Sequence, residues 1–168
     1  MSWQAPPPDP TNPDLLDNLR VYLIAQGLVR DPRDGTQKGI LPPLWLAPRF
    51  GVPAPGQTEG LAASEQDPNL VLGAFPATDT PPPPYEGFRR INHVEIVFRG
   101  RTPPAVLSIE NKIRAAINDK RGWMMANVPV NESLLFRGLQ PIGSDNLGWV
   151  FNQEYLFELW GPFTPVGP

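Results

Sequence analysis

The sequence has no cysteine, a single histidine and no long apolar run, and each of these absences excludes a class of chemistry. Without cysteine there is no disulfide framework, no thiolate metal site and no cysteine nucleophile. The one histidine, His93, rules out a histidine-rich metal site and disfavours a histidine-based triad. No apolar run approaches the roughly 18 residues of a membrane span, and the first residues lack the apolar core of a signal peptide. We therefore expect a soluble protein made in a cytoplasm, with no metal, cofactor or membrane partner.

Charge is also scarce, since only 18% of the residues are charged and the formal net charge is −3. Such a chain has no overall cationic attraction to nucleic acid. The first 88 residues hold ten acidic and five basic side chains, whereas residues 89–168 hold seven acidic and nine basic ones. Arginine is enriched at protein interfaces, which makes four arginines around one predicted strand a candidate subunit interface: Arg89, Arg90, Arg99 and Arg101. The alternative is a solvated sheet edge with local salt bridges.

Proline is the residue in clearest excess, with 24 prolines among 168 residues, yet the hydrophobic fraction is 40% and includes five Trp and eight Phe. A chain that can bury so many large side chains can offset the entropy cost of folding. We expect a flexible Pro-rich tail over residues 1–11, one α+β domain over 12–160 with loop insertions near 48–68 and 76–90, and a C-terminal tail over 161–168. The tracts Pro6–Pro8 and Pro81–Pro84 offer an alternative role as ligands of aromatic-groove domains.

Two segments are predicted to form helices. The first begins at Asn12, a favoured N-cap residue, and ends at Gly27. Its apolar residues recur every three or four positions and form one stripe of Leu15, Leu16, Leu19, Leu23 and Ile24. The second helix opens at Thr102-Pro103-Pro104 and carries a similar stripe of Val106, Ile109, Ile113, Ala116 and Ile117.

Several segments are predicted to form strands. Residues 44–46 and 69–75 are short candidates, while residues 91–99 form a half-buried strand with Asn92, Val94, Ile96 and Phe98 on its inner face. Residues 133–139 and 149–160 are expected to pair, joined by a connection over residues 141–146. The fold class is therefore α+β, with a mostly antiparallel sheet packed by two helices.

The candidate catalytic residues lie on the polar faces of these predicted strands. His93 shares such a face with Glu95, and a lone histidine there is more typical of a strand surface than of a catalyst. Glu95 with Glu154 or Glu158 could act as a carboxylate pair for acid–base chemistry, which keeps a small enzyme as one alternative. We expect a protein that is not an enzyme.

Two further patterns depart from the motifs that they resemble. Asp31, Asp34 and Gly35 lack the spacing of a calcium loop and predict a surface turn. Gly143 and Gly148 have the spacing of a phosphate-binding loop, but tryptophan and valine occupy the positions that need lysine and serine or threonine. Neither pattern predicts a ligand.

The order of the segments resembles a known family. The leading helix Asn-Pro-Asp-Leu-Leu-Asp-Asn-Leu-Arg-Val-Tyr-Leu is followed by a strand Val-Glu-Ile-Val-Phe-Arg-Gly at residues 94–100. A helix with isoleucines at 109, 113 and 117 and a final strand Tyr-Leu-Phe-Glu-Leu at residues 155–159 complete the pattern. Over residues 12–160 this is similar to the tail terminator (tail completion, minor capsid-like) proteins of long-tailed bacteriophages. The loops at 48–68 and 80–85 depart from a compact version of that pattern.

The resemblance implies a homohexameric ring that caps the head-proximal end of the tail tube in the virion, assembled in the host bacterial cytoplasm. Such a ring stops polymerisation of the major tail tube protein and binds the head-completion or connector protein. DNA passes through its lumen without sequence-specific binding. A head-to-tail connector or stopper of the neck is the alternative within the same particle, and an adaptor that binds proteins through its proline tracts is the alternative from a different class.

Overall fold

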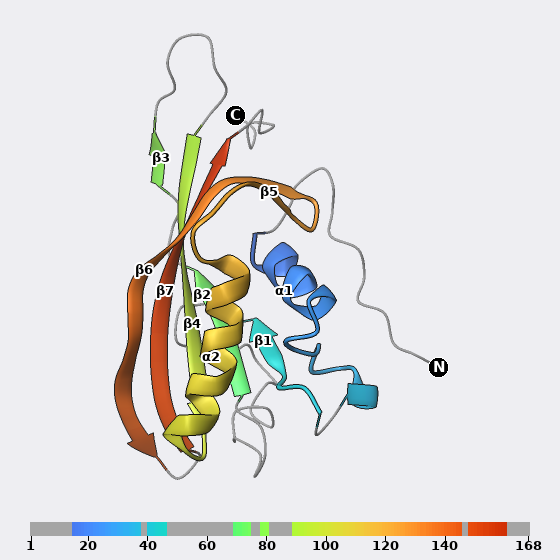
Figure 1. Cartoon of the computed structure of the whole chain (residues 1–168), viewed down its shortest axis with the longest axis vertical. Helices are drawn as coiled ribbons and strands as arrows, with labels where there is room; N and C mark the ends of the chain where they lie inside the picture. Colours follow the sequence, from blue (N-terminus) through green and yellow to red (C-terminus); the bar gives the residue numbers. More distant parts are fainter. Residues whose placement is uncertain are drawn as a thin grey trace, which may run out of the picture.

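The computed structural model describes residues 15–37, 40–46, 69–74, 78–80, 89–145 and 148–160 (Figure 1). These residues form two α-helices, one short 3₁₀ helix and seven strands, which confirms the predicted α+β class. The elements in chain order are α1 (Leu15–Ala25), η1 (Gly35–Gln37), β1 (Leu44–Leu46), β2 (Asn69–Ala74), β3 (Thr78–Thr80), β4 (Arg89–Gly100), α2 (Pro103–Ile117), β5 (Lys120–Met125), β6 (Val128–Asp145) and β7 (Gly148–Trp160).

The strands form one sheet in the order β1-β2-β4-β7-β6-β5, with β3 paired to part of β4. Among the described strands, only the β1–β2 pair is parallel. Both helices lie on one side of this sheet, and β5 with the start of β6 curls over α1 (Figure 1). Further along β6, the register with β7 has three irregularities between Leu135 and Gly143, and such bulges increase the local twist of a strand.

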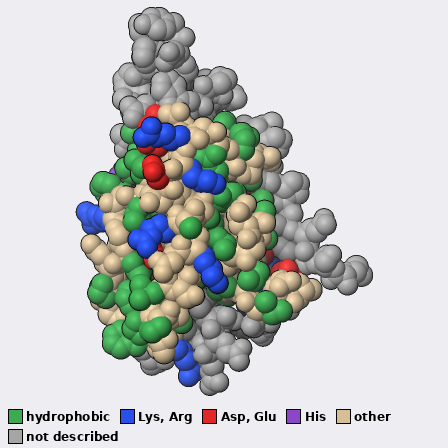
Figure 2. Space-filling model, in the orientation of Figure 1, with side chains coloured by type: hydrophobic (Ala, Val, Ile, Leu, Met, Phe, Trp, Pro, Cys, Tyr) green, Lys and Arg blue, Asp and Glu red, His purple; other side chains and the backbone are tan. Residues whose placement is uncertain are grey.

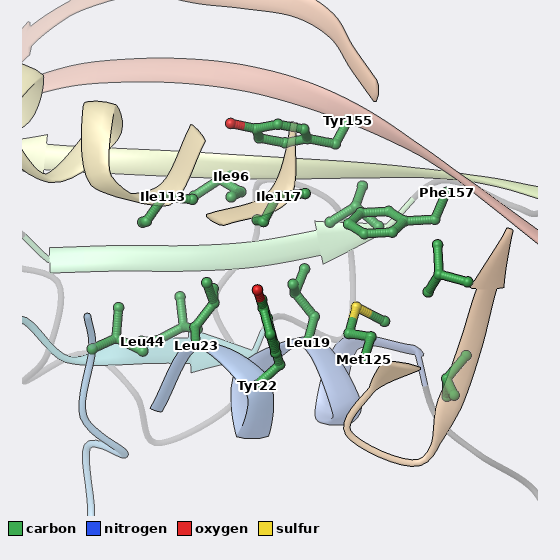
Figure 3. Close-up of a cluster of buried hydrophobic side chains, with 14 of the residues drawn as sticks. Leu19, Tyr22, Leu23, Leu44, Ile96, Ile113, Ile117, Met125, Tyr155 and Phe157 are labelled. Atoms are coloured by element: carbon green, nitrogen blue, oxygen red, sulfur yellow. The ribbon is translucent and has the colours of Figure 1, made fainter. Parts of the chain in front are cut away.

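The core lies between the helices and the sheet. In Figure 3, Leu19 and Leu23 of α1 and Ile113 and Ile117 of α2 form one cluster with Ile96, Tyr155 and Phe157 of the sheet. These side chains follow the two helical stripes and the strand alternation predicted from the sequence. The hairpin of β5 and β6 closes one end of the cluster with Met125, Val128 and Val130.

The predicted end of the first helix is confirmed by its backbone. Gly27 has a φ of 71°, and its N–H donates to the carbonyl of Ile24, while the N–H of Leu28 donates to the carbonyl of Leu23. These two bonds satisfy carbonyls that the end of a helix leaves without partners, and the positive φ favours glycine. The predicted start at Asn12 lies outside the described residues. The second helix has Thr102 as its N-cap and begins at Pro103, as predicted.

The predicted connection over residues 141–146 is wrong, because β6 runs through Pro141 to Asp145. Proline can occupy this strand because β5 pairs only with residues 128–133 of β6, which leaves Pro141 with a paired strand on one side only. The sequence also gave no prediction of β5 or β3. The turn between β5 and β6 uses Ala126 at a φ of 52°, and therefore carries no glycine signal.

The predicted tails and the insertion at 48–68 lie outside the described residues. Of the insertion at 76–90, only β3 and the first two residues of β4 are described. None of the helices in the described ranges is long and apolar enough to cross a membrane.

Candidate functional site: a glutamate cluster on the outer sheet face

The face of the sheet turned away from the helices, here called the outer face, carries the candidate site. Strand alternation sends Val94 and Ile96 into the core and His93 and Glu95 to the outer face. Neither of the two described helices packs on this face. It nevertheless presents large apolar side chains, since Leu134 is 37% exposed and Phe136 is 50% exposed. Apolar side chains at this exposure around a polar centre are typical of a contact surface.

Two glutamates face each other at the middle of the outer face. Glu95 of β4 and Glu154 of β7 are Cα partners in the antiparallel register, so their side chains leave the sheet side by side. Glu95 is only 3% exposed. Burial raises the pKa of the Glu95 carboxyl from 4.5 to about 7; the negative charge of Glu154 adds to this rise, and a hydrogen bond with Asn152 opposes it. Glu95 therefore takes up or releases its proton near neutral pH.

Side chains from β4 and β6 hold the second carboxylate of the pair. Nδ1 of His93 lies 2.9 Å from Oε1 of Glu154, and Nε of Arg137 lies 3.9 Å from Oε2. The ring of Phe136 meets the His93 ring edge to face at 5.5 Å between centroids. A register shift between Leu135 and Arg137 explains this arrangement, because an extra residue in β6 lets Phe136 and Arg137 both reach the outer face.

A second pair of like charges lies on the same face. Glu132 of β6 and Glu158 of β7 are also Cα partners. Arg121 of β5 lies 3.4 Å from Glu132, and Asn131 donates a hydrogen bond to Glu158 at 2.9 Å. Like charges directly opposite each other destabilise a sheet, and the contacts from Arg121 and Asn131 offset part of this repulsion.

The sequence offered two carboxylate pairs for acid–base chemistry, Glu95 with Glu154 or Glu95 with Glu158. The structure brings together only the first of them. Glu95 and Glu154 are neighbours, whereas Glu158 faces Ile91 and Glu132 further along the sheet. A general acid must come within hydrogen-bond distance of its substrate, and Glu95 has only 3% of its surface exposed. Within the described ranges no group of three or more His, Asp or Glu side chains is arranged to hold a metal ion. The burial of Glu95 therefore leaves its carboxyl out of direct reach of a substrate on this face.

The four arginines predicted as one subunit interface lie at two separate places. Arg89 and Arg90 begin β4, while Arg99 and Arg101 lie at and beyond its other end. A strand of 12 residues spans roughly 40 Å, so the four do not form a single patch. The side chains of Arg89 and Arg90 are outside the described part of the chain; that of Arg101 is exposed.

The acidic turn after α1 is more buried than the sequence predicted. Asp31 does lie in a turn, but only 2% of its surface is exposed. Its carboxylate lies 3.0 Å from Nη2 of Arg33 and 3.7 Å from Nη1 of Arg20. Burial opposes ionisation of Asp31, but the hydrogen bonds from Arg33 and the charges of both arginines prevail and lower its pKa. The turn is thus fixed by a buried ion pair, and we find no reason to assign it a ligand.

Sequence reasoning missed a polar network inside the core. Glu110 of α2 is 2% exposed and accepts a hydrogen bond from Gln153 of β7 at 2.9 Å, and Gln153 accepts one from the Tyr155 hydroxyl at 3.1 Å. Arg114 lies 3.3 Å from the same Glu110 oxygen. Burial raises the pKa of Tyr155, and the charge of Glu110 adds to the rise. The network orients α2 on the sheet. The only signal in the sequence was a glutamate next to the apolar stripe.

No model of a known protein family matches the chain, and no curated protein is significantly similar to it.

Proposed function

We propose that this chain is a structural protein of a bacteriophage virion, a tail terminator that forms a ring on the tail tube. The observation that carries the proposal is the order of elements in its C-terminal half. A long strand ends at Arg99-Gly100, α2 follows after two residues, and three antiparallel strands complete the sheet. This is the order on which the resemblance to tail terminators rests.

The surface chemistry supports an assembly role. A subunit of a closed ring must offer two different surfaces, one to each neighbour. The outer face, with Leu134, Phe136 and its glutamate pairs, provides one surface with the apolar and polar mixture of an interface. The helix side of the molecule provides a second surface of different composition. In the proposed ring, the major tail tube protein binds one end and the head-completion or connector protein binds the other.

Deletion of the gene from the phage genome that carries it tests the proposal. We expect tails of uncontrolled length that do not join heads, seen by electron microscopy, and restoration of normal tails by the wild-type gene supplied in trans. Tails of normal length that fail to join heads would assign the chain to the connector or stopper instead. Normal infectious particles would refute both roles.

A complementary measurement is the molar mass of the purified chain by light scattering, alone and with isolated tail tubes. A ring is expected in at least one of these conditions. A chain that remains monomeric in both, but binds an isolated aromatic-groove domain, would favour the adaptor role of the proline tracts.

A further inference from the structure

The hairpin of β5 and β6 projects beyond the central strands of the sheet. The register between β6 and β7 begins at Glu132, so residues 128–131 of β6 pair, among the described strands, with β5 alone. β5 in turn pairs with β6 alone in this part of the chain. A two-stranded hairpin is marginally stable in water without something to pack against. The projecting part, residues 120–131, is called the strap below.

The strap packs against α1, over which it curls (Figure 1). Met125, Val128 and Val130 of the strap are buried. They belong to the same apolar cluster as Leu19 and Leu23 of α1. Figure 2, drawn from the same side, shows no hollow in the surface where the strap meets this helix. Separation of the strap from α1 would therefore expose apolar side chains of both elements to water.

Two hydrogen bonds join the strap to one face of α1. Asn18 and Tyr22 are four residues apart in the helix, so their side chains lie on the same face. At the turn of the strap, the N–H of Asn127 donates to Oδ1 of Asn18 at 3.0 Å. At its base, Nζ of Lys120 donates to the Tyr22 hydroxyl oxygen at 2.9 Å. The helix therefore contacts both ends of the strap.

Lys120 also contacts two aromatic rings, one from each element. Its Nζ lies 4.6 Å from the centre of the Trp123 ring of the strap and 5.3 Å from that of Tyr22. The centres of the two rings are 4.8 Å apart. A cation over aromatic faces is stabilising, the more so where it is partly shielded from water. Lys120 is thus the residue through which the base of the strap is fixed to α1.

The central part of the domain has contacts of its own that involve neither the strap nor α1. β4 pairs with β7 along its whole length. Gln153 of β7 donates a hydrogen bond to the buried Glu110 of α2 at 2.9 Å, which joins this helix directly to the sheet. Proteins open locally in cooperative units, and the units with the fewest supporting contacts open most easily.

We propose that α1 and the strap form one conformational unit, which Lys120 keeps closed and which opens as a whole while β4, β7 and α2 stay folded. The two elements open together because each covers apolar side chains of the other. In the open form Leu19 and Met125 lose their cover at the same time, so one end of the subunit gains an apolar surface. The proposal goes beyond the ring function and does not depend on it.

Hydrogen exchange of the full chain in low concentrations of denaturant tests the proposal. In wild type, the amides of α1 and of the strap should share one free energy of opening, which is lower than that of the amides of β4 and β7. Different opening free energies for α1 and the strap would refute the proposal without any variant. A single opening free energy for all four elements would refute it as well.

Two variants weaken the contact from either side. Lys120→Met removes the charge and keeps an apolar chain, and Tyr22→Phe removes only the hydroxyl. Each should raise the exchange rates of both α1 and the strap by about tenfold. Lys112→Met makes the same change at an exposed lysine of α2 and should alter neither element. If each variant affects only the element that carries it, or if neither affects α1 and the strap, the proposal is refuted.

A third variant separates local opening from unfolding of the whole domain. Val106 is buried at the start of α2, whereas Tyr22 donates a hydrogen bond to the carbonyl of Ala116 at the end of that helix. Val106→Ala should raise the exchange rates of β4 and β7 by at least about tenfold, because its packing is lost only on global unfolding. The rates of α1 and the strap should stay as in wild type. An equal rise in all four elements would show that they open only together, and would refute the proposal.

Discussion

Replacing Glu95 by glutamine should stabilise the protein at alkaline pH, and the size of the effect follows from its position on the outer face. The folded chain holds the pKa of Glu95 at about 7, against 4.5 for the ordinary group, chiefly through burial and then through the charge of Glu154. A pKa difference of one unit corresponds to about 1.4 kcal/mol. Ionised Glu95 therefore costs the folded state up to about 3 kcal/mol, and glutamine of nearly equal volume avoids this cost.

The direction of the pH dependence is fixed by linkage. Between pH 4.5 and 7 the folded chain keeps the Glu95 proton while the unfolded chain has released it, so the stability of wild type falls as the pH rises. Below pH 4.5 both states are protonated and the group contributes nothing. Glu95→Gln should therefore resemble wild type near pH 4.5 and exceed it by up to about 3 kcal/mol near pH 8.5.

Denaturant unfolding at several pH values from 4.5 to 8.5 measures this difference directly. Glu132→Gln is the matched control, because it makes the same chemical change on the same face at a more exposed carboxylate, where it should alter stability by less than about 1 kcal/mol. A second variant, Glu154→Gln, should shrink the pH dependence by removing the neighbouring charge. Parallel stability curves for wild type and Glu95→Gln over the whole range would refute the reasoning.

Three further predictions test the packing that positions this site. Gly148→Ala should cost about 1 kcal/mol or more, because φ is 139° there and a Cβ would lie 2.8 Å from the Gly100 carbonyl oxygen; Gly138→Ala, which meets nothing within 4 Å, is the control for the same unfolding assay. Phe157→Ala should cost about 3–5 kcal/mol by emptying a fully buried position, and an unchanged melting temperature would contradict that placement in the core. Asp31→Asn should cost about 2 kcal/mol at pH 7. The lowered pKa of Asp31 means that this advantage of wild type should disappear as the pH falls below about 4, and a constant difference down to pH 2 would exclude the buried ion pair.

Periodic patterns in the sequence were sufficient to predict both α-helices and several of the strands. The apolar stripes of both helices, the strand at 44–46 and the alternation in β4 all match the structure, because a side chain's face within one element depends only on its position in the repeat. The same logic failed for β5, whose sequence Lys-Arg-Gly-Trp-Met-Met has no clear alternation. Its strand conformation comes from pairing with β6 and from the packing of Met125 into the core.

At the candidate site, too, the sequence predicted the face of each residue but not its partner. The sequence identified Glu95, Glu154 and Glu158 as outward-facing acids, but it could not choose between the two possible partners of Glu95. The choice depends on the β4–β7 register, which places Glu154 opposite Glu95 and Glu158 opposite Ile91. The role of Phe136 was not visible either, since it depends on the register shift in β6.

The sequence by itself determined the class of fold, the faces that are apolar and the shortage of groups for metal or nucleophilic chemistry, because these depend on composition and on local periodicity. Only the tertiary structure decided which residues meet. It separated the four arginines to the two ends of β4, buried Asp31 between two arginines and set two pairs of glutamates side by side on the outer face of the sheet. The physical reason is that strand register and helix packing are set by contacts between residues far apart in the chain, and these contacts alone determine the charge and burial of each side chain.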